Sequence, residues 1–218
     1  PAMALGGEKP QIDHTPCGGK TLETRFGATA PLDLIEGVSE TGKSHLTNQF
    51  VRNAFKLPGI ACGRFDFKGS SDMNAELGAL AEQLELLTPP TPGKNVTGQL
   101  AEIFSSLKRV ARPTLLIFDT FERAGEAEHW VKENLLLSVI RAPWLRVIIA
   151  GQRVPLKRGK SWEGISSDRI VLRSPTPEQW FDFGRQHEPT VTLDNVRMLH
   201  GLARGASSVM AQLLGPKN

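Results

Sequence analysis

The chain has 218 residues, and 26 Lys and Arg against 23 Asp and Glu give a formal net charge of +3. Its 39% hydrophobic and 22% charged content is ordinary for globular proteins and excludes a wholly disordered or collagen-like chain. No apolar run approaches the roughly 20 residues that cross a bilayer, and two cysteines cannot build a disulfide framework. We therefore expect a cytoplasmic protein without membrane contact, made of one domain of good size and a small appendage.

Residues 1–30 are polar and without periodicity, so we expect a leader that lacks a fixed structure. From residue 32, short apolar runs alternate with amphipathic stretches. The runs predict strands at 32–36, 60–67, 114–119, 145–150 and 169–172. The stretches predict helices at 42–55, 74–87, 100–110 and 130–140. Such alternation is typical of βαβ units, so we expect a three-layer α/β fold with a mostly parallel five-stranded sheet.

Two of the predicted helices show a clear apolar face with the spacing i, i+3, i+4, i+7. The face of the 74–87 helix consists of Leu77, Leu80, Ala81, Leu84 and Leu87. The face of the 100–110 helix consists of Leu100, Ile103, Phe104, Leu107 and Val110. These positions are the predicted contacts between the helices and the sheet.

The strand pattern stops after residue 174. Thr176, Pro177 and Gln179 form the signature of a capped helix start, because Thr caps, Pro suits the first helical position and Gln completes a capping box. Two further helical patterns follow near 193–203 and 207–214. The predicted organisation is therefore a core at 31–174 and a helical lid at 175–218.

Residues 37–44 match the phosphate-loop pattern G-x-x-x-x-G-K-[ST], between a predicted strand and a predicted helix. Glycines allow torsions and close approach that a Cβ blocks, and successive amides at a helix start form a nest for anions. Lys43 is expected to reach the β- and γ-phosphates, and the Ser44 hydroxyl to ligate Mg²⁺. The alternative is a glycine-rich turn that only joins strand to helix. The expected cofactors are ATP or ADP with Mg²⁺, and the residues expected to bind them are Gly37, Ser39, Glu40, Thr41, Gly42, Lys43, Ser44 and His45.

Two acidic residues follow the strongly apolar strand 114–119. Asp119 ends this strand and is the candidate Walker B carboxylate, which would hold Mg²⁺ together with Ser44. Its alternative role is to cap the next helix. Glu122 is the candidate catalytic residue that orients or deprotonates the attacking water, and its alternative is a solvated surface acid. Glu40 competes for this role from inside the loop, although we expect it to point to solvent.

Polar residues also close two other predicted strands. Arg153 follows the strand 145–150 and is the candidate sensor of the γ-phosphate, with a solvated surface arginine as the alternative. Asp66 ends the second strand, where it either faces the ligand edge of the sheet or caps the following loop. With Glu122 and Lys43, Arg153 completes the predicted catalytic set.

The chain resembles the STAND class of signal-transduction ATPases, relatives of the AAA+ proteins, over about residues 32–215. The resemblance rests on the phosphate loop, the strand and helix at 63–84, the run 115–122 that ends Asp-Thr-Phe-Glu, and the strand 147–153 that ends in arginine. It implies an ATP switch whose helical lid closes over the nucleotide and controls the oligomerisation of effector domains. Many bacterial members serve signalling or anti-phage defence. We expect either a fragment of a larger switch or an ATPase whose output lies in another protein.

Three functions follow from these expectations. The first is a switch that binds ATP, hydrolyses it slowly, acts on a protein partner or effector and forms homo-oligomers on ATP binding. The second is a regulatory or scaffold module that binds nucleotide without hydrolysing it. The third is a DNA-associated ATPase of the AAA+ type. Its support is weak, because a charge of +3 is mild and the basic clusters at 157–160 and 108–109 lack the interleaved aromatic residues that stack on bases.

Overall fold

A single parallel sheet forms the centre of the computed structural model, which describes residues 31–68, 73–155 and 169–216. Its strands lie in the order β2-β3-β4-β1-β5, and every adjacent pair is parallel. The strands are β1 (Leu32–Glu36), β2 (Ala61–Asp66), β3 (Thr114–Asp119), β4 (Leu145–Gly151) and β5 (Ile170–Val171). The predicted α/β fold with five strands is confirmed. The candidate leader at 1–30 and the basic run at 157–160 lie outside the described residues.

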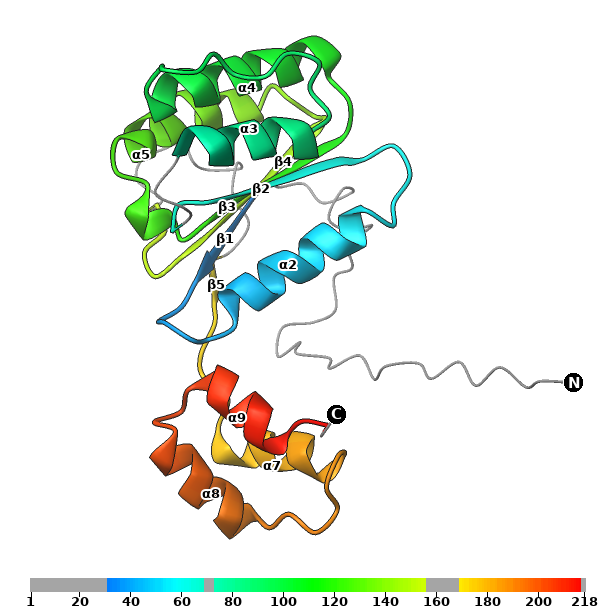
Figure 1. Cartoon of the computed structure of the whole chain (residues 1–218), viewed down its shortest axis with the longest axis vertical. Coiled ribbons are helices and arrows are strands. Elements are labelled where there is room, and N and C mark those ends of the chain that lie inside the picture. The colour runs from blue at the N-terminus through cyan, green and yellow to red at the C-terminus, as the bar shows by residue number, and fades with distance from the viewer. Residues whose placement is uncertain (1–30, 69–72, 156–168, 217–218) are drawn as a thin grey trace, which may run out of the picture.

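Helices cover both faces of the sheet (Figure 1). α2 (Lys43–Ala54) packs on one face, whereas α3 (Met73–Gln83), α4 (Val96–Val110) and α5 (Glu126–Trp130) lie on the other. A 3-10 turn, η1 (Phe121–Arg123), follows β3, and a π-helical turn, η2 (Val131–Leu135), joins α5 to α6 (Leu136–Val139). In the described ranges no helix has the length and apolarity needed to span a bilayer.

Alternate residues of the strands divide between two hydrophobic clusters, as strand geometry requires. In β3, Leu116 and Phe118 pack in the cluster that includes α3 and α4, whereas Leu115 and Ile117 pack in the cluster that includes α2. Both faces are therefore apolar, which explains why the central strands are continuous hydrophobic runs. The sheet is a rigid support for the residues at its edge.

The predicted helix at 74–87 is too long, because the chain leaves the helix after Gln83. Glu85 adopts a left-handed conformation (φ 51°), and the amide of Leu86 donates to the carbonyl of Ala81 at 3.0 Å. This is a Schellman ending, in which glycine is the usual left-handed residue. Leu87 is consequently fully exposed. Val110, expected on the buried face of α4, is also exposed (56%), because it stands beside the left-handed cap Ala111.

Three C-terminal helices form a hydrophobic cluster of their own: α7 (Pro177–Arg185), α8 (Leu193–Leu202) and α9 (Ser207–Leu214). Its buried members are Trp180, Val196, Met210 and Leu214. The predicted capping box is present: the Thr176 hydroxyl accepts from the amide of Gln179, and the Gln179 side chain accepts from the amide of Thr176. These helices lie beyond the end of the sheet that carries the phosphate loop (Figure 1).

Candidate functional site

The strand order brings the ends of β1, β4 and β3 together at the carboxyl edge of the sheet. β4 lies between β1 and β3, and Glu36 of β1 pairs with Gly151 of β4. The amide of Gly37 donates to the carbonyl of Gly151 at 3.2 Å, so the phosphate loop begins beside the end of β4. Ligands of open α/β sheets bind at this edge. The candidate residues at the ends of these strands therefore share one edge.

The phosphate loop is shaped by internal bonds and by two left-handed residues. Glu40 and Gly42 have φ of 63° and 88°. The Thr41 hydroxyl and Nζ of Lys43 both donate to the carbonyl of Val38, at 2.9 and 2.7 Å. A Cβ at Gly37 would lie 2.6 Å from Oγ1 of Thr41 and 2.8 Å from a carbonyl oxygen, so this position requires glycine. An α-helix leaves its first amides without an acceptor inside the helix, so the N-terminus of α2 favours the approach of an anion.

Lys43 lies among the charges of the site. Burial lowers the pKa of its ammonium group, and the nearby carboxylates of Glu122 and Asp119 oppose this shift. The three residues come from α2, the 3-10 turn and β3, so the fold places a cation and two anions within electrostatic range of one another. A phosphate group at the loop would add further negative charge beside the lysine, which favours its protonated form.

Asp119 ends β3 and is almost completely buried, with 1% exposure. Oδ2 of its carboxylate accepts from the Thr47 hydroxyl at 3.0 Å and from Nη2 of Arg64 at 2.6 Å. Oδ1 accepts from the amide of Thr120 at 2.9 Å. Thr47 is fully buried on α2, one turn after the phosphate loop. Asp119 is therefore fixed to both neighbouring elements, α2 and β2.

Glu122 turns back from the 3-10 helix onto the end of β4. Its Oε2 accepts from the main-chain amide of Gln152 at 2.8 Å. A Cβ at Gly151 would lie 2.6 Å from the same oxygen, so glycine makes room for the carboxylate. The Gln152 side chain in turn donates to the Ser39 hydroxyl of the phosphate loop at 3.3 Å. Glu122 and the loop are thus joined through Gln152, the residue that directly follows β4.

Asp66 belongs to a network at the ends of β2 and β3. Its Oδ2 lies 3.1 Å from Nη2 of Arg64, and its Oδ1 accepts from the Thr120 hydroxyl at 2.7 Å and from the amide of Lys68 at 3.0 Å. Thr120 itself is left-handed (φ 54°, ψ 41°), an unusual conformation for a β-branched residue. Strained residues of this kind are held by their surroundings and are frequent at functional sites. Asp66 therefore combines the two predicted roles: it lies at the ligand edge of the sheet beside Thr120, and it accepts from the amide of Lys68 in the following loop.

The remaining predicted residues lie at the same edge with fewer contacts. Ser44 and His45 are exposed on the first turn of α2, and the side chain of Glu40 is exposed as expected. Arg153 is exposed one residue beyond Gln152, and its role as a sensor stays a prediction. Sequence reasoning missed Thr47, Arg64 and Gln152. Position was the only signal for Arg64, a charged residue inside a strand, and for Gln152, directly after an apolar strand, whereas Thr47 is one of many polar residues of α2 and carried no signal.

The donor set fits a nucleotide with Mg²⁺. Asp119 keeps an acceptor position, the Ser44 hydroxyl is exposed, and Lys43 supplies a cation beside both. No cluster of three or more His, Cys, Asp or Glu side chains suited to a metal occurs among the described residues. Magnesium usually takes one or two carboxylates plus substrate phosphates, so this composition suits a metal that arrives with a nucleotide.

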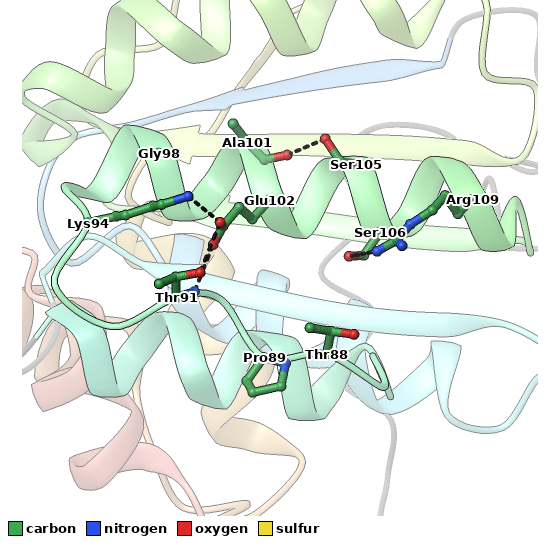
Figure 2. Close-up of a pocket in the computed structure, with 10 residues that line it drawn as sticks. All are labelled: Thr88, Pro89, Thr91, Lys94, Gly98, Ala101, Glu102, Ser105, Ser106 and Arg109. Atoms are coloured by element: carbon green, nitrogen blue, oxygen red, sulfur yellow. Dashed lines mark hydrogen bonds and ion pairs between the residues drawn. The ribbon is translucent and has the colours of Figure 1, made fainter.

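A second hollow of the described residues lies on the face of the sheet that α3 and α4 cover. It has a volume of about 380 Å³ and lies between α4 and the segment before it (Figure 2). The Glu102 carboxylate accepts from Lys94 and from both the amide and the hydroxyl of Thr91, and these bonds lower its pKa to about 2. Its charges are therefore paired with each other, and Arg109 donates to Ser106. The phosphate-loop edge remains the better candidate.

Solved structures with a similar fold include one signal-transduction ATPase and two ORC proteins. The chain is similar to a Signal Transduction ATPase with Numerous Domains protein with a tetratricopeptide repeat sensor from Pyrococcus horikoshii, at TM-score 0.53 and 18% identity over 90% of this chain and 29% of that chain. The chain is also similar to the ORC1 protein of Aeropyrum pernix, solved in complex with DNA. The TM-score is 0.61 and the sequence identity 14%, over 88% of this chain and 57% of that chain. For the ORC2 protein of the same organism, solved in ADPNP and ADP complexes, the TM-score is 0.51 and the sequence identity 10%. This match covers 90% of this chain and 66% of that chain.

These similarities, all at 18% identity or less, establish the fold alone: the chain shares the parallel α/β sheet and its covering helices with these solved structures. The chain spans 29%, 57% and 66% of the three solved chains. A scan against protein-family models and a search of curated proteins gave no match.

Proposed function

We propose that the chain is the ATP-binding switch module of a bacterial signalling or anti-phage defence protein of the STAND class, and that it hydrolyses ATP slowly. The observation that carries this proposal is the joining of the phosphate loop to both acidic residues. Thr47 connects the loop helix to Asp119, and Gln152 connects the loop to Glu122. A glycine-rich turn that only linked strand to helix would not need these two connections.

The side chains have distinct roles in this proposal. Lys43 and the loop amides bind the β- and γ-phosphates, and Ser44 and Asp119 hold Mg²⁺, which neutralises charge on the phosphates. Glu122 orients the attacking water and accepts its proton, while the amide of Gln152 fixes one oxygen of this carboxylate. Gln152 contacts the loop directly and is a second candidate sensor beside Arg153. The helical segment 175–218 acts as the lid, and its closure passes the nucleotide state to an effector or to another copy of the chain.

Nucleotide binding is the first test. Lys43→Ala removes a charged donor and is expected to weaken the affinity for ATP with Mg²⁺ on the order of 100-fold. Binding is measured by calorimetry on the full chain. Lys56→Ala, at an exposed lysine beyond the end of the same helix, is the matched control and should bind as the wild type does. Equal affinity in the two variants would contradict the proposal.

Turnover distinguishes the switch from a scaffold that binds nucleotide without hydrolysing it. Glu122→Gln should reduce ATP hydrolysis by about 10²- to 10⁴-fold, as expected for the loss of a general base, with little change in ATP affinity. Phosphate release under single-turnover conditions measures the step. If the wild type releases no phosphate above buffer, even at high protein concentration, the scaffold function is the correct one.

A DNA-associated ATPase is the second candidate, favoured by the likeness to a protein solved in complex with DNA. Within the described residues, the predicted basic cluster Lys108 and Arg109 lies in the last turn of α4, where Lys108 stacks over the ring of Phe104 and Arg109 bonds Ser106. Binding to duplex DNA at low salt, lost as salt rises, would support this function. Absence of binding at low salt would remove it.

A further inference from the structure

An ion pair joins β2 to the carboxylate proposed to hold magnesium. Nη2 of Arg64 lies 2.6 Å from Oδ2 of Asp119 and 3.1 Å from Oδ2 of Asp66. Asp119 is 1% exposed and the Arg64 side chain is 22% exposed. Because water has little access to this contact, the charges act on each other, and on any third charge nearby, more strongly than at an open surface.

Arg64 has contacts besides the one to Asp119, including a second carboxylate partner on its own strand. Its main-chain amide donates to Oε1 of Gln83 at 2.8 Å, and its guanidinium is paired with Asp66. Asp66 is itself fixed by the Thr120 hydroxyl and by the amide of Lys68. The guanidinium is therefore a positive charge held between two carboxylates near the end of β2.

The bonds to Asp119 leave little of its carboxylate uncommitted. A carboxylate offers about four acceptor positions, two on each oxygen. Oδ2 accepts from Thr47 and Arg64, and Oδ1 accepts from the amide of Thr120. The remaining position is on Oδ1.

We propose that Arg64 is a positioning residue that sets how strongly magnesium contributes to nucleotide binding, an inference that rests on the proposed function. By holding Oδ2, Arg64 leaves Oδ1 as the oxygen available to the metal or to its water shell. Its positive charge also opposes a divalent cation at Asp119. Both effects limit the gain in nucleotide affinity that Mg²⁺ provides, and they keep the nucleotide complex sensitive to the loss of the metal.

The test compares the dissociation constant of ADP in EDTA with that in excess Mg²⁺ and takes the ratio of the two. In Arg64→Met the ratio should rise about tenfold over the wild type, because a positive charge near the metal is removed. Arg64→Lys keeps the charge and should stay close to the wild-type ratio. Arg112→Met is the matched control, since Arg112 also pairs with a carboxylate but stands before the start of β3, at the opposite edge of the sheet.

A ratio in Arg64→Met that is unchanged or lower would overturn the inference, because Arg64 would then be neutral toward the metal or would assist it. The inference would also be overturned if Arg64→Lys and Arg64→Met gave the same ratio. If Arg64→Met does not fold, Arg64→Gln removes the charge while keeping a donor near both carboxylates. A wild-type chain that binds no nucleotide in either buffer would instead overturn the proposed function, and the inference with it.

Discussion

The phosphate-loop edge and the C-terminal helices differ in how many of their buried polar side-chain atoms have a hydrogen-bond partner. At the edge, Asp119 accepts three hydrogen bonds, and its donors are held by further contacts. In the helices, Trp180 Nε1, His187 Nε2, His200 Nε2 and Ser207 Oγ are buried without a partner, and among the described residues only Nε of Arg64 shares this condition.

This difference predicts that the edge is more rigid than the C-terminal helices. Polar contacts with defined geometry hold the edge in one arrangement, whereas a cluster of four buried side chains holds the helices together. Such a small core has low local stability, and elements that move in switches come from the low-stability end of a structure. The helices are therefore suited to be the part that responds to nucleotide.

The largest expected effect would separate the two regions. Trp180→Ala should cost the C-terminal helices about 3–5 kcal/mol, enough to unfold them while the sheet persists. Hydrogen exchange measured by mass spectrometry would show rapid exchange at 177–214 with the strands still protected. Leu202→Ala, at a leucine that is 76% exposed, is the control and should leave exchange unchanged. Unfolding of the whole chain in one step would show that the regions are not independent.

A smaller effect is expected at the sheet edge. Asp119→Asn removes the charge that faces Arg64 and should lower the free energy of unfolding by about 2 kcal/mol, below the usual cost of breaking a buried ion pair because Arg64 keeps Asp66. Urea denaturation in the absence of nucleotide measures it. Glu85→Gln breaks the exposed pair with Arg112 and should cost less than about 0.5 kcal/mol. Equal costs at the two sites would mean that the edge is no more rigid than the surface.

A third prediction, with a smaller expected effect than Trp180→Ala or Asp119→Asn, tests a local contact in the helices. Thr176→Ala removes the capping box of α7 and should cost about 1 kcal/mol. Exchange of the first amides of α7 should accelerate, while those of β3 should not. Thr176→Ser keeps the hydroxyl and should restore slow exchange. If Ser and Ala behave alike, the capping bond does not limit the opening of the helices.

The strands were predicted nearly to the residue because burial on both faces makes them continuous apolar runs, and Leu115 to Phe118 is one example. Helix ends were less predictable. Glu85 and Ala111 adopt the left-handed conformation for which glycine is the usual signal. The sequence therefore predicted a helix longer than α3 and a buried Val110, whereas Val110 is exposed. Local preference does not reveal such an ending when tertiary packing of Leu86 determines it.

The residues of the candidate site also differ in whether a local sequence signal predicts them. Lys43, Asp119 and Glu122 were found because the phosphate-loop pattern and the end of an apolar strand are local signals. Thr47 and Arg64 are joined to Asp119 across 72 and 55 positions of the chain, and no local pattern encodes such a pairing. The sequence prediction named Arg153 and not its neighbour Gln152, because an arginine is the residue type expected to sense a phosphate. Only the fold shows that the Gln152 side chain contacts the loop.

The place of β1 in the sheet also determines when the phosphate loop can form. β1 bonds to β4 and β5, and Leu32 pairs with Val147, more than a hundred residues later in the chain. During synthesis β1 emerges early but has no strand to join until β4 has left the ribosome. Pairing across so long a stretch of chain is slow and leaves strand edges open while it is incomplete. A nascent chain that ends before residue 145 therefore lacks the support of its nucleotide site, although the whole phosphate-loop motif has already been made.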